Sequence, residues 1–136
     1  MSSIEQTLSI IKPDAVERNL QEEIKIEFRN NGFEIINEKK IHISKEEAEK
    51  FYKVHESKPF YNDLCDYLSS GPIVVMVLEK ENAVLGNRDL MGATNPKDAA
   101  EGTIRKKYGI SIDKHSVHGS DSVENAKIEI EFFFKD

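Results

Sequence analysis

Four stretches of the chain carry apolar patterns that are typical of β-strands. Thr7–Ile11 is rich in β-branched residues, and Phe33–Ile43 alternates imperfectly between apolar and polar positions. Ile73–Leu78 is a continuous apolar run with several β-branched residues. This pattern suits a strand that is buried on both faces, so we place it at the centre of a sheet. A fourth, short strand is expected to end at Val117 or His118.

Between the strands, the apolar positions change to steps of three and four residues, which predicts amphipathic helices. The last helix shows these steps most clearly, with apolar residues at Val123, Ala126, Ile130 and Phe133. Asp121 and Ser122 precede this helix as candidates for its N-terminal cap. The other helices are expected over about Leu20–Asn31, from the capping box Ser44-Lys45-Glu46-Glu47 through Val54, over Phe60–Leu68, and over Ala83–Met91 with Asn82 as cap.

The order of the elements is β, α, β, α-hairpin, β, α, loop, β, α, which predicts an α/β sandwich. The pattern leaves the order of the strands within the sheet open. A length of 136 residues suggests one domain, 1–136, that is long enough to bury about two-thirds of its unfolded surface.

Composition narrows the classes of function. Charged residues make up 32% of the chain and the formal net charge is −6, which argues against nonspecific binding to nucleic acid or to anionic membranes. The longest apolar run, Ile73–Leu78, is far shorter than the ~20 residues of a membrane helix. Cys65 is the only cysteine, and no signal-peptide pattern opens the chain. We therefore expect a soluble, cytoplasmic protein.

The strongest candidate for chemistry is His118, which lies in the stretch His115–Ser122 directly before the last helix. Backbone N–H groups and the positive end of the helix dipole point toward it. Gly119 permits a backbone turn that would expose the imidazole at the lip of a cleft. Glu129 shares a face with the helix start, so its carboxylate can hold one ring nitrogen and leave the other free to attack.

Other interpretations of these residues remain open. A histidine near a helix cap is more often a capping or core residue than a nucleophile. His115 and His118 also suggest a metal site, although residues three apart on an extended segment point to opposite faces. Arg105-Lys106-Lys107 is compatible with a nucleic-acid patch, but such a run in an acidic chain is more often a solvated face or a local anion site.

The stretch His118-Gly119-Ser120-Asp121-Ser122, followed by a helix, resembles the active-site signature of nucleoside diphosphate kinases. The rest of the chain is similar to that family nearly end to end, including Ile11-Lys12-Pro13-Asp14-Ala15-Val16 near its start. The resemblance implies a ferredoxin-like, four-stranded antiparallel sheet covered by helices on one side.

The resemblance also implies a reaction. The terminal phosphoryl group of a nucleoside triphosphate such as ATP would pass to a nucleoside diphosphate such as GDP, in a ping-pong mechanism through phosphohistidine at His118. Mg²⁺ should arrive with the nucleotide phosphates rather than in a protein site, and a homo-oligomer is expected, with a hexamer favoured over a tetramer. A nucleotide-binding or phosphohistidine-relay module with little turnover is the alternative.

Each further site residue follows from the resemblance. His115 stands where most members have an asparagine that contacts the sugar hydroxyl, and an imidazole can make the same hydrogen bond. The remaining implied roles are phosphate binding by Lys12, Arg88, Thr94 and Arg105, with Lys12 also catalytic and in contact with the sugar; base contact by Phe60, Leu64 and Ile112; orientation of His118 by Glu129 with Ser120 or Ser122; and support by Tyr52.

Overall fold

The computed structural model describes residues 4–93, 96–109 and 117–134. Most of its helices and strands lie close to the predicted segments, but the stretch expected as a loop after the fifth helix contains a 3₁₀ turn and a further short helix. In chain order they are β1 (Ile4–Ile11), α1 (Pro13–Glu17), α2 (Gln21–Asn30), β2 (Glu34–Ile41), α3 (Lys45–Phe51), the 3₁₀ turn η1 (Lys53–His55), α4 (Tyr61–Leu68), β3 (Ile73–Glu81), α5 (Ala83–Met91), the 3₁₀ turn η2 (Pro96–Asp98), α6 (Ile104–Tyr108), β4 (Val117–Gly119) and α7 (Val123–Phe134).

The strands form a four-stranded antiparallel sheet in the order β2-β3-β1-β4, which agrees with a ferredoxin-like fold. β3 and β1 are the two central strands, as the apolar run in β3 predicted. The short strand β4 pairs with β1 at one edge, where His118 lies opposite Ile10 and Gly119 lies opposite Ser9. This edge is therefore the part of the sheet that carries the candidate nucleophile.

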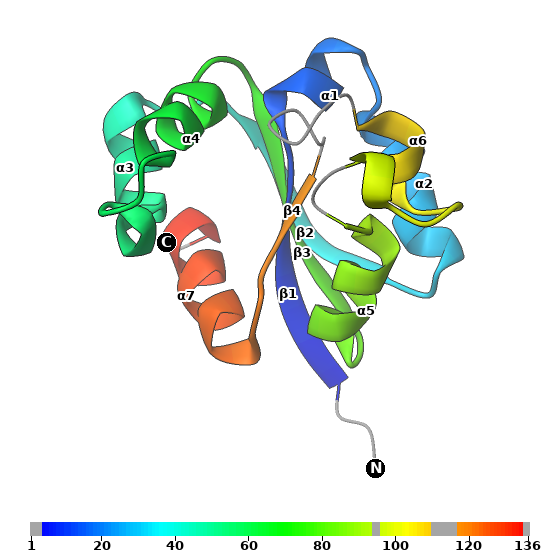
Figure 1. Ribbon diagram of the computed structural model, residues 1–136. Helices are drawn as coiled ribbons and strands as arrows, with labels where there is room; N and C mark the ends of the chain where they lie inside the picture. Colours follow the sequence, from blue (N-terminus) through cyan, green and yellow to red (C-terminus); the bar gives the residue numbers. More distant parts are fainter. Residues whose placement is uncertain (1–3, 94–95, 110–116, 135–136) are drawn as a thin grey trace.

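Helices cover both faces of the sheet (Figure 1), which corrects the expectation of one covered side. The reason is the two-sided burial of β3. Val74, Met76 and Leu78 belong to a core with α1, α2 and α5, whereas Ile73 and Val75 belong to a second core with α3, α4 and α7. Successive residues of a strand point to opposite faces, so one continuous apolar run supplies both cores.

Side-chain caps explain where two of the helices begin. The predicted capping box at α3 is present, with Ser44 Oγ accepting from the Glu47 backbone N–H and the Glu47 carboxylate accepting from the Ser44 N–H. At α7, Ser122 Oγ accepts from the Asn125 backbone N–H at 3.1 Å. Ser122 is therefore the cap of the helix that follows His118.

The expected cap of α5 is correct in its position but makes no capping hydrogen bond. Asn82 occupies the cap position with a φ of 54°, in the left-handed region, and its side chain makes no capping hydrogen bond. Instead, the Glu5 carboxylate on β1 accepts from the backbone N–H of Val84 at 3.3 Å. A residue that is remote in sequence thus satisfies a donor at the start of α5.

The imperfect alternation in the second strand has a structural cause. The register between β2 and β3 shifts between Ile35 and Asn37, so the side chains beyond the shift face the opposite way from a regular strand. Among the helices that the structure describes, none combines the length and the apolar character needed to cross a membrane.

Candidate active site

His118 lies on β4 with one ring nitrogen bound and the other open. Its Nε2 is 3.0 Å from Oε1 of Glu129, a residue of α7. Within the described part of the chain, Nδ1 has no hydrogen-bond partner. An ionised carboxylate only accepts hydrogen bonds, so the pairing assigns the imidazole proton to Nε2 and leaves a lone pair on Nδ1. This is the arrangement that the spacing between His118 and Glu129 predicted.

Glu129 is itself held by Ser120. The Ser120 hydroxyl donates to Oε1 of Glu129 at 2.8 Å and accepts from the backbone N–H of Leu8 at 3.3 Å. Ser120 is fully buried and its own N–H donates to the Leu8 carbonyl. The chain of hydrogen bonds therefore runs from the imidazole to the backbone of the central strand β1.

An aromatic contact that the sequence analysis missed packs against His118. The ring of Phe51, at the end of α3, meets the imidazole edge to face, with centroids 5.4 Å apart and an interplanar angle of 76°. Phe132 and Phe133 of α7 pack against the other parts of the Phe51 ring. The sequence shows Phe51 only as an apolar helix residue, since its contact depends on how α3 meets α7.

Tyr52, predicted as a supporting residue, lies in the core beside this cluster. It is buried, and its ring packs against Phe51 and His55. Burial raises the pKa of the Tyr52 hydroxyl above its ordinary value, with Cys65 and then Glu129 adding to the increase. The hydroxyl therefore stays protonated in the neighbourhood of Glu129.

Arg105 and Lys12 are buried cations near the same edge strand. Arg105 on α6 donates from Nη1 to the Gly92 carbonyl at 2.9 Å and from Nη2 to the Val117 carbonyl at 3.0 Å. Burial, and secondarily repulsion from Arg88, lowers the pKa of Arg105 to about 10. Lys12 directly follows β1 and is 3% exposed, with Nζ 5.8 Å from the centroid of the Tyr67 ring.

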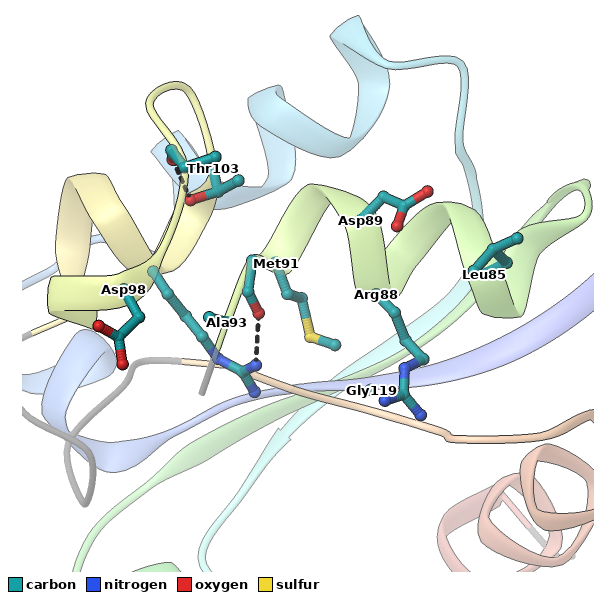
Figure 2. Close-up of a pocket in the computed structure, with 11 residues that line it drawn as sticks. Leu85, Arg88, Asp89, Met91, Ala93, Asp98, Thr103 and Gly119 are labelled. Carbon is teal, nitrogen blue, oxygen red and sulfur yellow. Dashed lines mark hydrogen bonds between the residues drawn. The ribbon is translucent and has the colours of Figure 1, made fainter. Parts of the chain in front are cut away.

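A cavity of about 600 Å³ opens between α5, α6 and β4. Figure 2 shows Arg88 extending from α5 toward β4 at Gly119. The lining residues that carry charge or adjoin His118 are Arg88, Asp89, Asp98, Arg105 and Gly119. The structure thus brings together two of the predicted phosphate ligands with the residue that follows the candidate nucleophile.

Gly119 is needed for space rather than for a turn, which corrects the expectation from sequence. It lies inside β4 and its φ is outside the left-handed region. A Cβ at this position would lie 2.4 Å from Nδ2 of Asn87 and 2.7 Å from Cε of Met91. Glycine therefore allows α5, with Arg88, to approach the edge strand closely.

Phe60 and Leu64, the two predicted base-contact residues that the structure describes, do not line this cavity. Phe60 is 46% exposed at the start of α4, with the His55 ring 6.1 Å away and the Lys58 ammonium 5.7 Å from its centroid. Leu64 packs partly into the core with α3 and α7. Thr94, Ile112 and His115 lie outside the described residues. Nowhere in the described ranges do three or more His, Cys, Asp or Glu side chains gather in a way that could hold a metal ion.

Comparisons with known proteins show the family to which the chain is similar. A family model described as "Nucleoside diphosphate kinase" matches residues 5–136. A protein of that name from Campylobacter jejuni subsp. jejuni is 61% identical over 132 residues, which are 97% of this chain and 96% of that protein. Another from Wolinella succinogenes is 60% identical over 131 residues, 96% of each chain.

Solved structures show the same similarity. The nucleoside diphosphate kinase of Aquifex aeolicus superimposes with a TM-score of 0.96 at 39% identity, covering 98% of this chain and 96% of that one. The nucleoside diphosphate kinase of Encephalitozoon cuniculi superimposes with a TM-score of 0.93 at 39% identity, covering 97% of this chain and 90% of that one.

Proposed function

We propose that this chain, which belongs to the nucleoside diphosphate kinase family and transfers phosphoryl groups between nucleotides, does so through a phosphohistidine at Nδ1 of His118. The observation that carries the proposal is the hydrogen-bond chain from His118 Nε2 through Glu129 to Ser120. This hydrogen-bond chain fixes the orientation of the imidazole through Nε2 and leaves Nδ1 available as the nucleophile.

In the first half-reaction, the lone pair of Nδ1 attacks the terminal phosphorus of a nucleoside triphosphate. The N–P bond forms while the bond to the bridging oxygen breaks, and the nucleoside diphosphate leaves with that electron pair. A neutral imidazole attacks without first losing a proton, and the Glu129 carboxylate offsets the positive charge that the ring gains. A terminal oxygen of the acceptor diphosphate then attacks the same phosphorus and restores the imidazole.

The cations supply the charge that this transfer needs. Phosphoryl transfer depends mainly on positioning and on stabilising the negative oxygens. Lys12, Arg88 and Arg105 come from separate segments and are proposed to bind these oxygens together with Thr94. Because β4 is an edge strand, a ligand lying along that edge can reach both the imidazole on one side and the arginine-lined cavity on the other.

We propose that Mg²⁺ enters with the nucleotide and is held by its phosphate oxygens. Mg²⁺ gives up its water ligands reluctantly and is usually bound through substrate phosphates with one or two carboxylates, rather than in an all-protein cage. When bound, the ion would neutralise part of the phosphate charge.

Base recognition is proposed to rest on stacking. Phe60 presents an exposed ring, and Leu64 and Ile112 are apolar side chains. The three proposed base contacts therefore include no polar reader, and the slot should accept purines and pyrimidines. His115 is proposed to contact the sugar together with Lys12. Tyr52, Ser120 and Ser122 support the site: Ser120 holds Glu129, and Ser122 caps the helix that carries it.

We also propose a single nucleoside diphosphate kinase domain over residues 1–136, a homo-oligomer with a hexamer favoured over a tetramer, and a cytoplasmic location. The family match over residues 5–136 supports the domain, and the single cysteine is compatible with a reducing compartment. Sedimentation of the purified protein measures the number of subunits.

The test of the mechanism uses γ-labelled ATP. We expect acid-labile, alkali-stable label on His118, which GDP removes as labelled GTP. His118→Ala should take up no label, while His42→Ala, which changes an exposed histidine bound to the Ser69 carbonyl, should behave as wild type. Label on serine, or label that persists in His118→Ala, would overturn the mechanism. Label that GDP cannot remove would favour the relay module instead.

A further inference from the structure

The proposed phosphate ligands come from separate segments, and a network of hydrogen bonds around Asp14 joins two of these segments to α4. Asp14 is 6% exposed and lies two residues after Lys12. A buried carboxylate needs hydrogen-bond donors to compensate for its loss of water. Its donors are Tyr67 on α4 and Arg18, directly after α1.

Tyr67 binds Asp14 twice through one oxygen. Its hydroxyl donates to Oδ1 of Asp14 and accepts from the Asp14 backbone N–H at 3.1 Å. The two bonds fix both the side chain and the main chain of Asp14 relative to α4. Burial, followed by the hydrogen bond to Asp14, raises the pKa of Tyr67 above its ordinary value, so the hydroxyl keeps the proton that it donates.

The network continues from Asp14 to α6. Nη2 of Arg18 lies 3.2 Å from Oδ2 of Asp14 and donates to the backbone carbonyl of Tyr108 at 2.5 Å. Tyr108 is the last residue of α6, the helix that carries Arg105. The bonds therefore link α4 to the turn after Lys12 and to the helix of Arg105.

The Tyr67 ring also contacts Lys12 itself. The Lys12 ammonium is 5.8 Å from the ring centroid, within the range of a cation–π contact, and the lysine is almost completely buried. Tyr67 thus contacts the Lys12 ammonium with its ring and binds Asp14, in the turn after Lys12, with its hydroxyl.

We infer that Tyr67 is a positioning residue that sets Lys12 relative to Arg105 for binding nucleotide phosphates. The inference rests on the proposed function only in taking Lys12 as a phosphate ligand. Loss of the Tyr67 hydroxyl removes two hydrogen bonds to Asp14 and lets the turn after Lys12 move. The side chains of Lys12, Arg105 and His118 are themselves unchanged in this variant.

The experiment is a double-mutant cycle on ADP binding, measured by calorimetry with Tyr67→Phe, Lys12→Gln and the double variant. We expect Tyr67→Phe to raise the Kd of ADP about tenfold in the wild-type background, the effect of losing a hydrogen bond to a charged group. In the Lys12→Gln background the same change should raise the Kd by less than about twofold, because the two residues act as one unit. An equal factor in both backgrounds, or no change in either, would refute the inference.

A matched control and a second variant separate positioning from general damage. Tyr61→Phe removes another hydroxyl from α4, one that donates to the Glu49 carbonyl at 3.0 Å, and should leave the Kd unchanged. An equal loss in Tyr61→Phe would contradict the inference. If Tyr67→Phe does not fold, Arg18→Gln tests the same network, with an expected rise in Kd of about threefold for a partly exposed ion pair; an unchanged Kd would count against it.

The outcome of the ADP-binding cycle does not depend on the phosphohistidine mechanism. Tyr67→Phe should still acquire label on His118 at saturating ATP. If wild type acquires none, the phosphohistidine mechanism fails, while the binding cycle still reports on Tyr67 and Lys12.

Discussion

The two sides of the edge strand β4 are built in different ways. On the α7 side, the imidazole of His118, the carboxylate of Glu129 and the hydroxyl of Ser120 bind one another and then the backbone of β1. On the α5 side, Arg88 and Arg105 line an open cavity, and the guanidinium of Arg105 donates to backbone carbonyls. The α7 side thus holds the candidate nucleophile through side-chain hydrogen bonds, whereas the α5 side places two arginines beside Asp89 and Asp98 around a cavity.

The buried guanidinium of Arg105 makes the second arrangement costly in free energy. Burial lowers the pKa of Arg105 to about 10, so keeping the guanidinium charged in the empty protein costs free energy. A phosphate group in the cavity would offset this cost. Under the proposed function, the two sides are a nucleophile that is oriented before the ligand arrives and a phosphate site that ligand binding completes.

The largest expected effect concerns the nucleophile side. Glu129→Gln keeps a hydrogen-bond acceptor but removes the charge that offsets the phosphorylated ring, so we expect the rate of His118 phosphorylation to fall about 100-fold in single-turnover measurements. Glu131→Gln, an exposed position on the same helix, should change this rate by less than about twofold. Equal losses in both variants would show that the charge of Glu129 has no special role.

Gly119→Ala tests how closely α5 packs against β4, the strand that lies between the two sides. The added Cβ would lie 2.4 Å from Asn87 and 2.7 Å from Met91, so we expect the free energy of unfolding to fall by about 1–3 kcal/mol in urea titrations. In Gly71→Ala, the nearest atom is Cβ of Pro13 at 3.5 Å, and the loss should stay within about 0.5 kcal/mol. A Gly119→Ala variant as stable as Gly71→Ala would mean that the ends of the buried Asn87 and Met91 side chains can move aside, or that α5 can retreat from the strand, at little cost.

Arg105 gives the cavity side a distinct pH dependence. Above its pKa of about 10 the empty protein loses the proton that phosphate binding requires, so binding takes up a proton and weakens as the pH rises. We expect this group to raise the Kd of ADP by up to about tenfold per pH unit above that pKa. Arg105→Gln lacks this group and keeps Lys12. The ratio of the wild-type Kd to the Arg105→Gln Kd, measured from pH ~8.5 to ~11, therefore isolates the contribution of Arg105 to the pH dependence. A constant ratio would contradict the prediction.

The smallest effect is expected at His115, which lies outside the described residues. His115→Asn should preserve turnover and change the nucleotide KM by a few-fold at most, because both side chains can hydrogen-bond a sugar hydroxyl. It should also remove one ionisation near pH ~6.5 from the profile of kcat/KM, since an amide does not titrate. If the variant forms no phosphohistidine, His115 has a catalytic role rather than a sugar contact.

Local sequence patterns determined much of the fold and part of the site. The capping box of α3 needs residues only three apart, and the apolar steps of α7 repeat within one helix, so both were predictable. The pairing of His118 with Glu129 was predictable for the same reason, since a short strand, a capped turn and two turns of helix bring them together. Residues farther apart, such as Arg88 and Arg105, entered the site prediction only through family resemblance.

Contacts between remote segments were decided by the tertiary structure alone. The second covered face of the sheet, the Glu5 cap of α5, the Phe51 ring against His118 and the Tyr67 network around Asp14 each join elements that are far apart in the chain. Gly119 shows the same limit, because the atoms that exclude a Cβ belong to Asn87 and Met91 on another element. The sequence by itself determined which segments form helices and strands, since hydrogen bonds and side-chain periodicity act over a few residues. Which faces meet, and hence which residues line one cavity with Arg88 and Arg105, depended on packing between those segments, for which no local pattern carries a signal.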